Sequence, residues 1–191
     1  MGKGSWLAVL GVLSFGGAMA QAQDQERGKM FITPFVGSTH LRIDSGQVYN
    51  ESQTFRVDSL QTGVRLGYRA PFGLVVEVGR SSAVHANLFD DHGDYWLTQG
   101  FGAIGWRVEF ADGWHITPRV GRESWELSSD RRVFPDDAGV RHTSIDGWQN
   151  FWEVGLTRDV KSWLSLGVNF KDVNEDFGHS RTGEFTASFQ F

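Results

Sequence analysis

The sequence predicts an all-β fold, an eight-stranded antiparallel up-and-down transmembrane β-barrel. Apolar residues alternate with polar or small residues along eight segments of the chain. The connections between these segments alternate between short and long, and aromatic residues gather beside the short ones. A strand that faces lipid on one side and a barrel interior on the other requires this period of two.

A short apolar segment precedes the eight alternating ones. It follows Lys3 and runs from Trp6 to Phe15, which is too short for a helix to cross about 30 Å of hydrocarbon. Small residues at positions 18, 20 and 22 suit a signal peptidase, so cleavage is expected after Ala20 or Ala22. We therefore expect a signal peptide over residues 1–22 and a barrel domain over residues 23–191.

The composition excludes several classes of protein. Hydrophobic residues make up 40% of the 191 residues, and the mean hydropathy of −0.31 would by itself indicate a soluble chain. A barrel escapes this test because it exposes only every second residue to lipid. The absence of cysteine excludes disulfides and thiol chemistry, and the net charge of −5 argues against nucleic acid as a partner. The sequence predicts no cofactor and no metal site.

The first predicted strand, 30–43, has the least regular pattern. Phe35 and Leu41 lie on one face, while Ile32 and Val36 lie on the other. The later strands alternate more strictly. Their apolar faces are formed by Val64, Leu66 and Tyr68 in 59–70; Leu74, Val76 and Val78 in 72–81; Ile104, Trp106 and Val108 in 95–110; Trp114, Ile116 and Val120 in 113–126; Trp152, Val154 and Leu156 in 148–158; Leu164, Leu166 and Val168 in 162–173; and Phe185, Phe189 and Phe191 in the last segment.

The lengths of the connections predict how the barrel is oriented in the membrane. Tight, turn-prone joins occur at 70–73, 111–113 and 159–162, whereas the joins at 44–58, 82–94, 127–147 and 174–180 are long and polar. Membrane barrels have short periplasmic turns and longer outer loops. Aromatic residues beside the short turns and chain ends predict a girdle at the periplasmic interface, formed by Phe31, Tyr68, Phe72, Phe110, Trp114, Trp163 and Phe191.

These features resemble the OmpA- and OmpX-like eight-stranded outer-membrane barrels. The resemblance covers roughly residues 28–191 and rests on the glycine-aromatic texture of 63–68 and 102–106 and on the terminal Phe185-x-x-x-Phe189-x-Phe191. It implies location in the cell outer membrane, and it implies that the barrel-assembly machinery reads Phe185, Phe189 and Phe191. It also implies contact with outer-membrane lipid and lipopolysaccharide. We expect a monomer.

Several charged residues occupy the alternate strand positions whose side chains are expected to face the barrel interior, and they predict an ion-pair network there. Eight strands leave an interior that side chains can fill, and an unpaired charge there would be costly. A symmetric hairpin around Pro71 would set Arg65 opposite Glu77. The interpretation favoured is a structural network that plugs the barrel, and the alternative is a gated pore for small solutes. The predicted set is Arg65, Glu77, Arg107, Glu109, Arg119, Glu123, Glu153 and Glu184.

The function predicted is a non-enzymatic surface barrel whose extracellular loops bind a host or envelope ligand, as the resemblance implies. Asp90-Asp91-x-x-Asp94 could hold a divalent cation, but it lacks the spacing of a dedicated calcium loop. Some similar barrels are lipid A acyltransferases or deacylases. Here His179-Ser180 and Ser81-Ser82-x-x-His85 are the enzyme candidates, although adjacent strand residues point to opposite faces.

Overall fold

The computed structural model describes residues 28–43, 55–85, 95–129, 134–135, 141–175 and 178–191. The predicted signal peptide, residues 1–22, lies outside these ranges, as does Asp90-Asp91-x-x-Asp94. Within them, no helix has the length and hydropathy needed to cross a bilayer.

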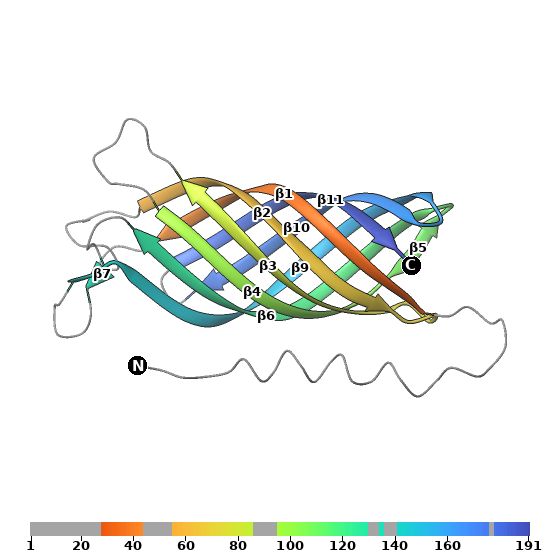
Figure 1. The fold of residues 1–191 in the computed structure, drawn as a ribbon, viewed down its shortest axis with the longest axis horizontal. Coiled ribbons are helices and arrows are strands. Elements are labelled where there is room, and N and C mark those ends of the chain that lie inside the picture. The colour runs from red at the N-terminus through yellow and green to blue at the C-terminus, as the bar shows by residue number, and fades with distance from the viewer. Residues whose placement is uncertain (1–27, 44–54, 86–94, 130–133, 136–140, 176–177) are drawn as a thin grey trace.

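Long antiparallel strands form the wall of a closed barrel (Figure 1). Each pairs with the next along the chain, and the last pairs with the first. A break at Arg107 separates two strands that both pair with the same neighbour, so eight strands make up the described wall. The strands are β1 (Lys29–Ile43), β2 (Phe55–Arg69), β3 (Leu74–His85), β4 (Tyr95–Trp106), β5 (Val108–Ala111), β6 (Trp114–Ser129), β7 (Phe134–Pro135), β8 (Arg141–His142), β9 (Ser144–Lys161), β10 (Leu164–Glu175) and β11 (Gly178–Gln190).

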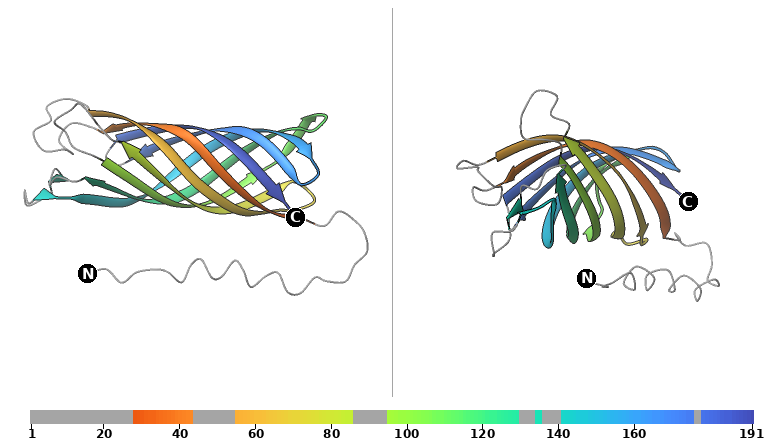
Figure 2. Two further views of the ribbon diagram at one scale, coloured as in Figure 1. Left: turned by 45° about the horizontal axis from the view of Figure 1, so that its top comes forward. Right: turned by 60° about the vertical axis from the view of Figure 1, so that its left-hand side comes forward.

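The two ends of the barrel differ as predicted. The short turns lie at the same end as the C-terminus, and the strand ends that flank the long connections lie at the other (Figures 1 and 2). The small sheet formed by β7 and β8 also lies at the long-connection end. The backbone of Phe191 closes the seam at the short-turn end, because its N–H and C=O each pair with Met30 at 3.0 Å.

The strands extend further toward the long-connection end than the apolar pattern indicates. Residues 55–58, 82–85, 127–129 and 144–147, predicted as loop, continue the strands, as do parts of 174–180. The sequence misses these ends because backbone pairing does not require apolar side chains once the strand has left the lipid. The hydrogen-bonded ladder therefore continues where the alternation becomes polar.

The turn between β2 and β3 sets a register different from the one predicted. Gly73 has a φ of 97°, and its N–H donates to the Ala70 carbonyl at 3.0 Å. The three-residue loop 71–73, which ends in this left-handed glycine, moves the centre of the turn from Pro71 to Phe72. Arg65 consequently pairs with Gly79 rather than with Glu77, so the expectation that they lie directly opposite was wrong.

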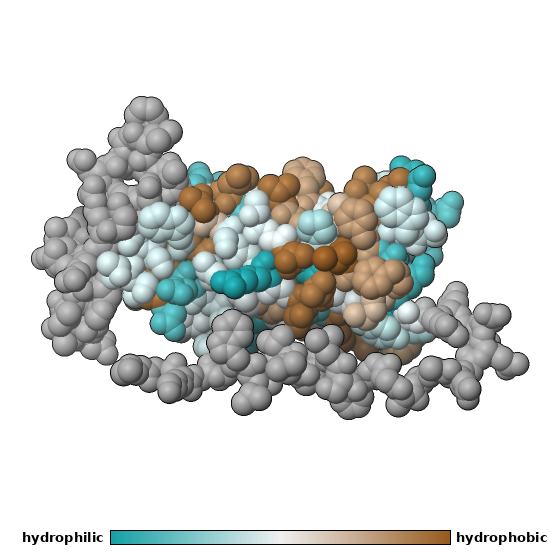
Figure 3. Space-filling view, in the orientation of Figure 1, coloured by the Kyte–Doolittle hydropathy of each residue, from teal (hydrophilic) through white to brown (hydrophobic). Residues whose placement is uncertain are grey.

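Side chains divide by face as a membrane wall requires. Val64 and Leu66 of β2 are exposed, whereas Arg65 and Glu77 are each only 2% exposed. The irregular first strand follows the same rule, with Ile32 outside and Phe35 buried inside. Hydrophobic side chains are prominent on the outer surface (Figure 3). The barrel thus buries polar groups and exposes apolar ones, which is the reverse of a soluble protein and suits lipid contact.

Candidate functional site: the barrel interior

An ion-pair cluster built on Arg65 occupies the part of the interior nearer the short turns. The Arg65 guanidinium donates from Nη1 to Glu77 Oε1 at 3.0 Å and to Glu153 Oε1 at 2.8 Å, and from Nη2 to Glu184. Glu77, Glu153 and Glu184 come from β3, β9 and β11, so one side chain links strands from around the barrel. Although the register places Arg65 and Glu77 diagonally, the long side chains still meet.

A second arginine completes this cluster, which we call the lower ion-pair centre. Arg119 Nε lies 3.1 Å from Glu77 Oε1, and its Nη1 donates to Glu153 Oε1 at 2.9 Å. Asn169 donates to Glu184 at 3.3 Å. Two arginines thus face three carboxylates in the buried interior, where hydrogen bonding to each charged group offsets part of its desolvation cost.

Aromatic rings lie above this centre, toward the long connections. The Arg65 guanidinium lies 4.9 Å from the ring centroid of Phe35 and 5.1 Å from that of Phe101, which packs edge-on against Phe151 at 6.1 Å. Glycine makes room for these rings. A Cβ added at Gly121 would lie 2.4 Å from the Phe151 ring, so no larger residue fits there without movement.

The upper polar centre comprises Glu123, Lys171, Gln99, Gln149 and Gln61. Lys171 Nζ donates to Glu123 Oε2 at 2.8 Å, while Gln99 and Gln149 both donate to Glu123 Oε1 at 2.8 Å. Gln61 donates to Gln99 at 3.0 Å, which extends the network to β2. The Lys171 ammonium also lies 5.4 Å from the Phe151 ring and thereby links this centre to the aromatic layer.

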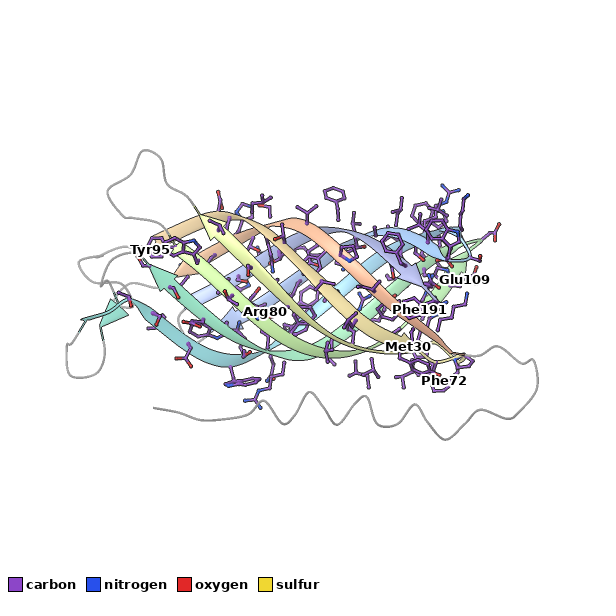
Figure 4. The ribbon with its side chains drawn as sticks, viewed as in Figure 1. Met30, Phe72, Arg80, Tyr95, Glu109 and Phe191 are labelled. Atoms are coloured by element: carbon purple, nitrogen blue, oxygen red, sulfur yellow. The ribbon has the colours of Figure 1, made fainter. Side chains whose placement is uncertain are left out.

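An apolar cluster fills the interior closest to the long connections, and we call it the apolar cap. It consists of Leu41, Ala83, Tyr95, Leu97, Trp125 and Leu127. Tyr95 is labelled at that end of the barrel in Figure 4. Strand β6 shows the order of the layers, because Arg119, Glu123 and Leu127 follow one another along its inward face.

The short-turn end is more open. A cavity of about 880 Å³ is lined there by Lys29, Arg69, Arg107 and His115, among others. A smaller cavity of about 50 Å³ further inside reaches Arg65 and Glu77 of the lower ion-pair centre. Solvent therefore has room at this mouth, and the described interior beyond it contains ion pairs, rings and apolar side chains.

The predicted charge set divides among several places. Five members form the lower ion-pair centre, and Glu123 belongs to the upper polar centre. Arg107 lies apart, donating to Asp159 Oδ1 at 2.6 Å near His115. Glu109 does not point inward as expected. It is exposed on β5, where the strand is irregular, and it accepts from the Gly113 N–H at 3.1 Å (Figure 4).

Lys171 and the amides around it were not predicted as members of the interior network. Lys171 shares the inward face of β10 with Ser165 and Asn169, so its parity could have placed it in the set. The glutamines give no comparable signal, because amides are common on both faces of strands. Their role follows only from their meeting at Glu123.

No protein-family model and no curated protein matches this sequence. Solved structures do match in fold. Neisserial surface protein A, NspA, covers 86% of this chain and 98% of its own at 12% identity, with a TM-score of 0.61. Ail of Yersinia pestis, in complex with the heparin analogue sucrose octasulfate, covers 87% and 100% at 11% identity, with a TM-score of 0.56. The N-terminal β-barrel domain of Pseudomonas aeruginosa OprF covers 87% and 100% at 12% identity, with a TM-score of 0.53.

The chain has the fold of an outer-membrane barrel. At this level of identity the likeness concerns the fold alone. Together with the apolar exterior, it agrees with the architecture predicted from the alternation of residues. The fold brings the predicted assembly residues to the lipid-facing side: Phe185 is 70% exposed, Phe189 38% and Phe191 76%. Their recognition by the assembly machinery stays a prediction.

The predicted aromatic girdle surrounds the short-turn end of this outer-membrane-type barrel. Tyr68, Phe72, Phe110 and Trp163 are exposed there (Figure 4 labels Phe72 and Phe191). Phe31 is the exception, because its ring points inward and lies over Gly67. Phe31 and Phe35 are separated by an even number of residues on β1, so both side chains point inward. The alternation, and not the nearness of Phe31 to the rim, decided the direction of its ring.

The structure places His179 and Ser180, one of the two candidate pairs, on opposite faces of β11. Ser180 is buried, whereas His179 bonds Asp172 at 3.0 Å. Ser81 lies in the interior, where it accepts from Gln61 at 2.8 Å. The side chain of His85 lies outside the described residues. None of Ser81, Ser82 and Ser180 therefore has a histidine base among its described hydrogen-bond partners.

Proposed function

We propose that this chain is an integral outer-membrane protein of a Gram-negative cell. Its barrel serves as a closed scaffold, and its long outer connections bind a host or envelope ligand. The observation that carries the proposal is the filled interior. From Arg65 to Leu127, successive layers of ion pairs, rings and apolar side chains occupy the barrel, so its surface is the part free to act.

The filling favours a scaffold over a pore for small solutes. Two separate charged centres and the apolar cap would all have to move to admit water from end to end. Salt bridges held by several partners resist such movement. We therefore expect no conductance steps when the refolded protein is added to planar lipid bilayers. Regular ohmic steps would favour the pore instead.

We also infer a non-enzymatic role. The separation of His179 from Ser180 supports this, because acyl transfer by a serine requires a base within hydrogen-bond reach. Mass spectrometry of lipid A from cells with and without the gene tests it. An unchanged acylation pattern is expected, and a gained or lost acyl chain would contradict the inference.

The long connections contain the charged side chains that we expect to bind the ligand. In sequence they are rich in charge, with Asp90, Asp91, Asp136 and Asp137 beside Arg131 and Arg132. Replacing residues 44–54, 86–94 and 130–140 one segment at a time by short Gly-Ser links tests their role. Whole cells would be assayed for adhesion to immobilised host matrix and for survival in serum, and at least one replacement is expected to reduce one of these.

A matched control keeps loss of folding apart from loss of binding. Glu109→Gln changes an exposed charge at the opposite end and should leave both assays unchanged. Each variant must also keep the faster migration of a folded barrel on unheated gels. If every folded replacement behaves as the wild type does in both assays, the long connections do not carry the function proposed.

A further inference from the structure

Two arginines point outward from the barrel wall toward lipid. Arg80 lies on β3 opposite Gly100 of β4, and Arg122 lies on β6 opposite Gly102 of β4. Both side chains are exposed, and Figure 4 labels Arg80 on the wall between the two ends. Because β4 separates β3 from β6 and the two registers are offset by two residues, the Cα atoms of Arg80 and Arg122 lie about 12 Å apart.

Both arginines lie in the outer half of the apolar band. Arg80 follows Leu74 by six residues, and Arg122 follows Trp114 by eight, along strands that rise from the short turns. With strands tilted by about 40°, this places both roughly 15–20 Å above the short-turn rim of a band about 25 Å tall. Val78 and Val120 precede them on the same faces, and Ser82 and Ser124 follow.

Neither arginine has a carboxylate partner among the side chains that the structure describes. The Arg122 guanidinium lies 5.5 Å from the ring centroid of Trp148, which neutralises no charge. By contrast, Arg181 is also outward-facing and donates to Asp172 at 3.1 Å. A lipid-facing arginine within the hydrocarbon band is costly unless an anion meets it. The wall therefore offers two cations at one level that lack a protein counter-ion.

The strand between the two arginines leaves the wall shallow. A Cβ placed at Gly102 would meet nothing closer than the Glu77 carbonyl oxygen at 4.0 Å, and one at Gly100 would meet the Ser124 hydroxyl at 3.3 Å. Below these glycines, Ile104 is 50% exposed. An acyl chain can thus lie against the β4 backbone while a polar headgroup stays at the level of the arginines.

We propose that Arg80 and Arg122 bind the two phosphates of a bisphosphorylated, acylated disaccharide lipid in the outer leaflet. Phosphatidylethanolamine and phosphatidylglycerol each carry a single phosphate and would satisfy one guanidinium, whereas such a glycolipid carries a phosphate at each end of one headgroup. Ser82, Ser124 and Asn150, which pairs with Arg122 in register, provide hydroxyl and amide groups for the sugar. The site lies on the barrel wall, so it does not depend on what the long connections bind.

Native mass spectrometry of the folded barrel in neutral detergent micelles, titrated with bisphosphorylated lipid A, tests this proposal. Arg80→Gln and Arg122→Gln should each weaken binding about tenfold, since each removes charge-assisted hydrogen bonds to phosphate. The double variant should lose most of the binding. Arg158→Gln is the matched control, because Arg158 also lies over a tryptophan, at 5.4 Å from Trp114, but at the short-turn rim. It should bind lipid A as the wild type does.

Two further titrations distinguish the phosphates of lipid A from the phosphate of a glycerophospholipid. Dephosphorylated lipid A should bind at least tenfold more weakly to the wild type, and phosphatidylglycerol should not displace bisphosphorylated lipid A at equal concentration. The double variant should fold at least as well as the wild type in neutral detergent, because it removes unpaired charge from an apolar surface. Equal loss in Arg158→Gln, retention of binding by the double variant, or equal competition by phosphatidylglycerol would each overturn the proposal.

Discussion

At the scale of single residues, Arg65 holds the interior together. It reaches carboxylates on three other strands while its own side chain is 2% exposed. This residue and most of its partners were predictable from sequence for two reasons. The strand alternation assigns them to the inward face, and a buried charge needs a partner of opposite charge. The identity of each pair was not predictable, because long side chains meet diagonally and across the interior, and alternation specifies only the face.

We expect Arg65→Gln to destabilise the folded barrel by about 3–5 kcal/mol, because removing one partner of a buried pair leaves charge uncompensated. Glu77 and Glu153 would then depend on Arg119, and Glu184 would keep its bond from Asn169. The midpoint of urea unfolding in lipid vesicles, followed by tryptophan fluorescence, measures the effect. Arg158→Gln should cost no more than about 1 kcal/mol, since that arginine is exposed and only overlies a ring. Equal shifts of the two midpoints would show that the lower ion-pair centre adds little stability.

At the scale of elements, the sequence predicted the strands and their faces better than their ends. Lipid imposes the alternation, so the pattern is clear from Leu164 to Phe170 and in the other membrane-facing segments. Outside the lipid, strands such as β6 continue as far as Ser129 without an apolar signal. Registers depend on turn geometry, and the left-handed Gly73 changed the β2–β3 register from the one a symmetric turn would give.

We expect Gly73→Ala to destabilise the barrel by about 1–3 kcal/mol. Its φ of 97° is unfavourable for alanine, and the added Cβ would lie 2.8 Å from the Arg107 carbonyl oxygen. Gly183→Ala is the control, because a Cβ there meets nothing within 4 Å and should change stability by less than about 0.5 kcal/mol. Comparable urea midpoints for the two variants would show that the turn tolerates a side chain.

At the scale of the whole molecule, barrel closure depends on the two ends of the wall meeting. Phe191 and Met30 exchange backbone hydrogen bonds at 3.0 Å, and β11 pairs with β1 along its length. An even number of strands makes this possible while leaving both ends of the wall at the short-turn rim. Phe191 thus has two roles in the wall, one for its exposed ring on the lipid side and one for its backbone at the seam. The resemblance implied only the first.

These two roles can be separated by replacing the ring alone. We expect Phe191→Ser to lower the amount of folded protein in the outer membrane several-fold, measured on unheated gels of cell envelopes. Refolding of the purified variant into detergent micelles should remain near the wild-type yield, because the backbone pair with Met30 is kept. Phe72→Ser is the matched control: that ring is 62% exposed at the same rim but lies in a turn. If both variants assemble equally well in cells, or if Phe191→Ser also fails in micelles, the ring acts through stability rather than through recognition during assembly.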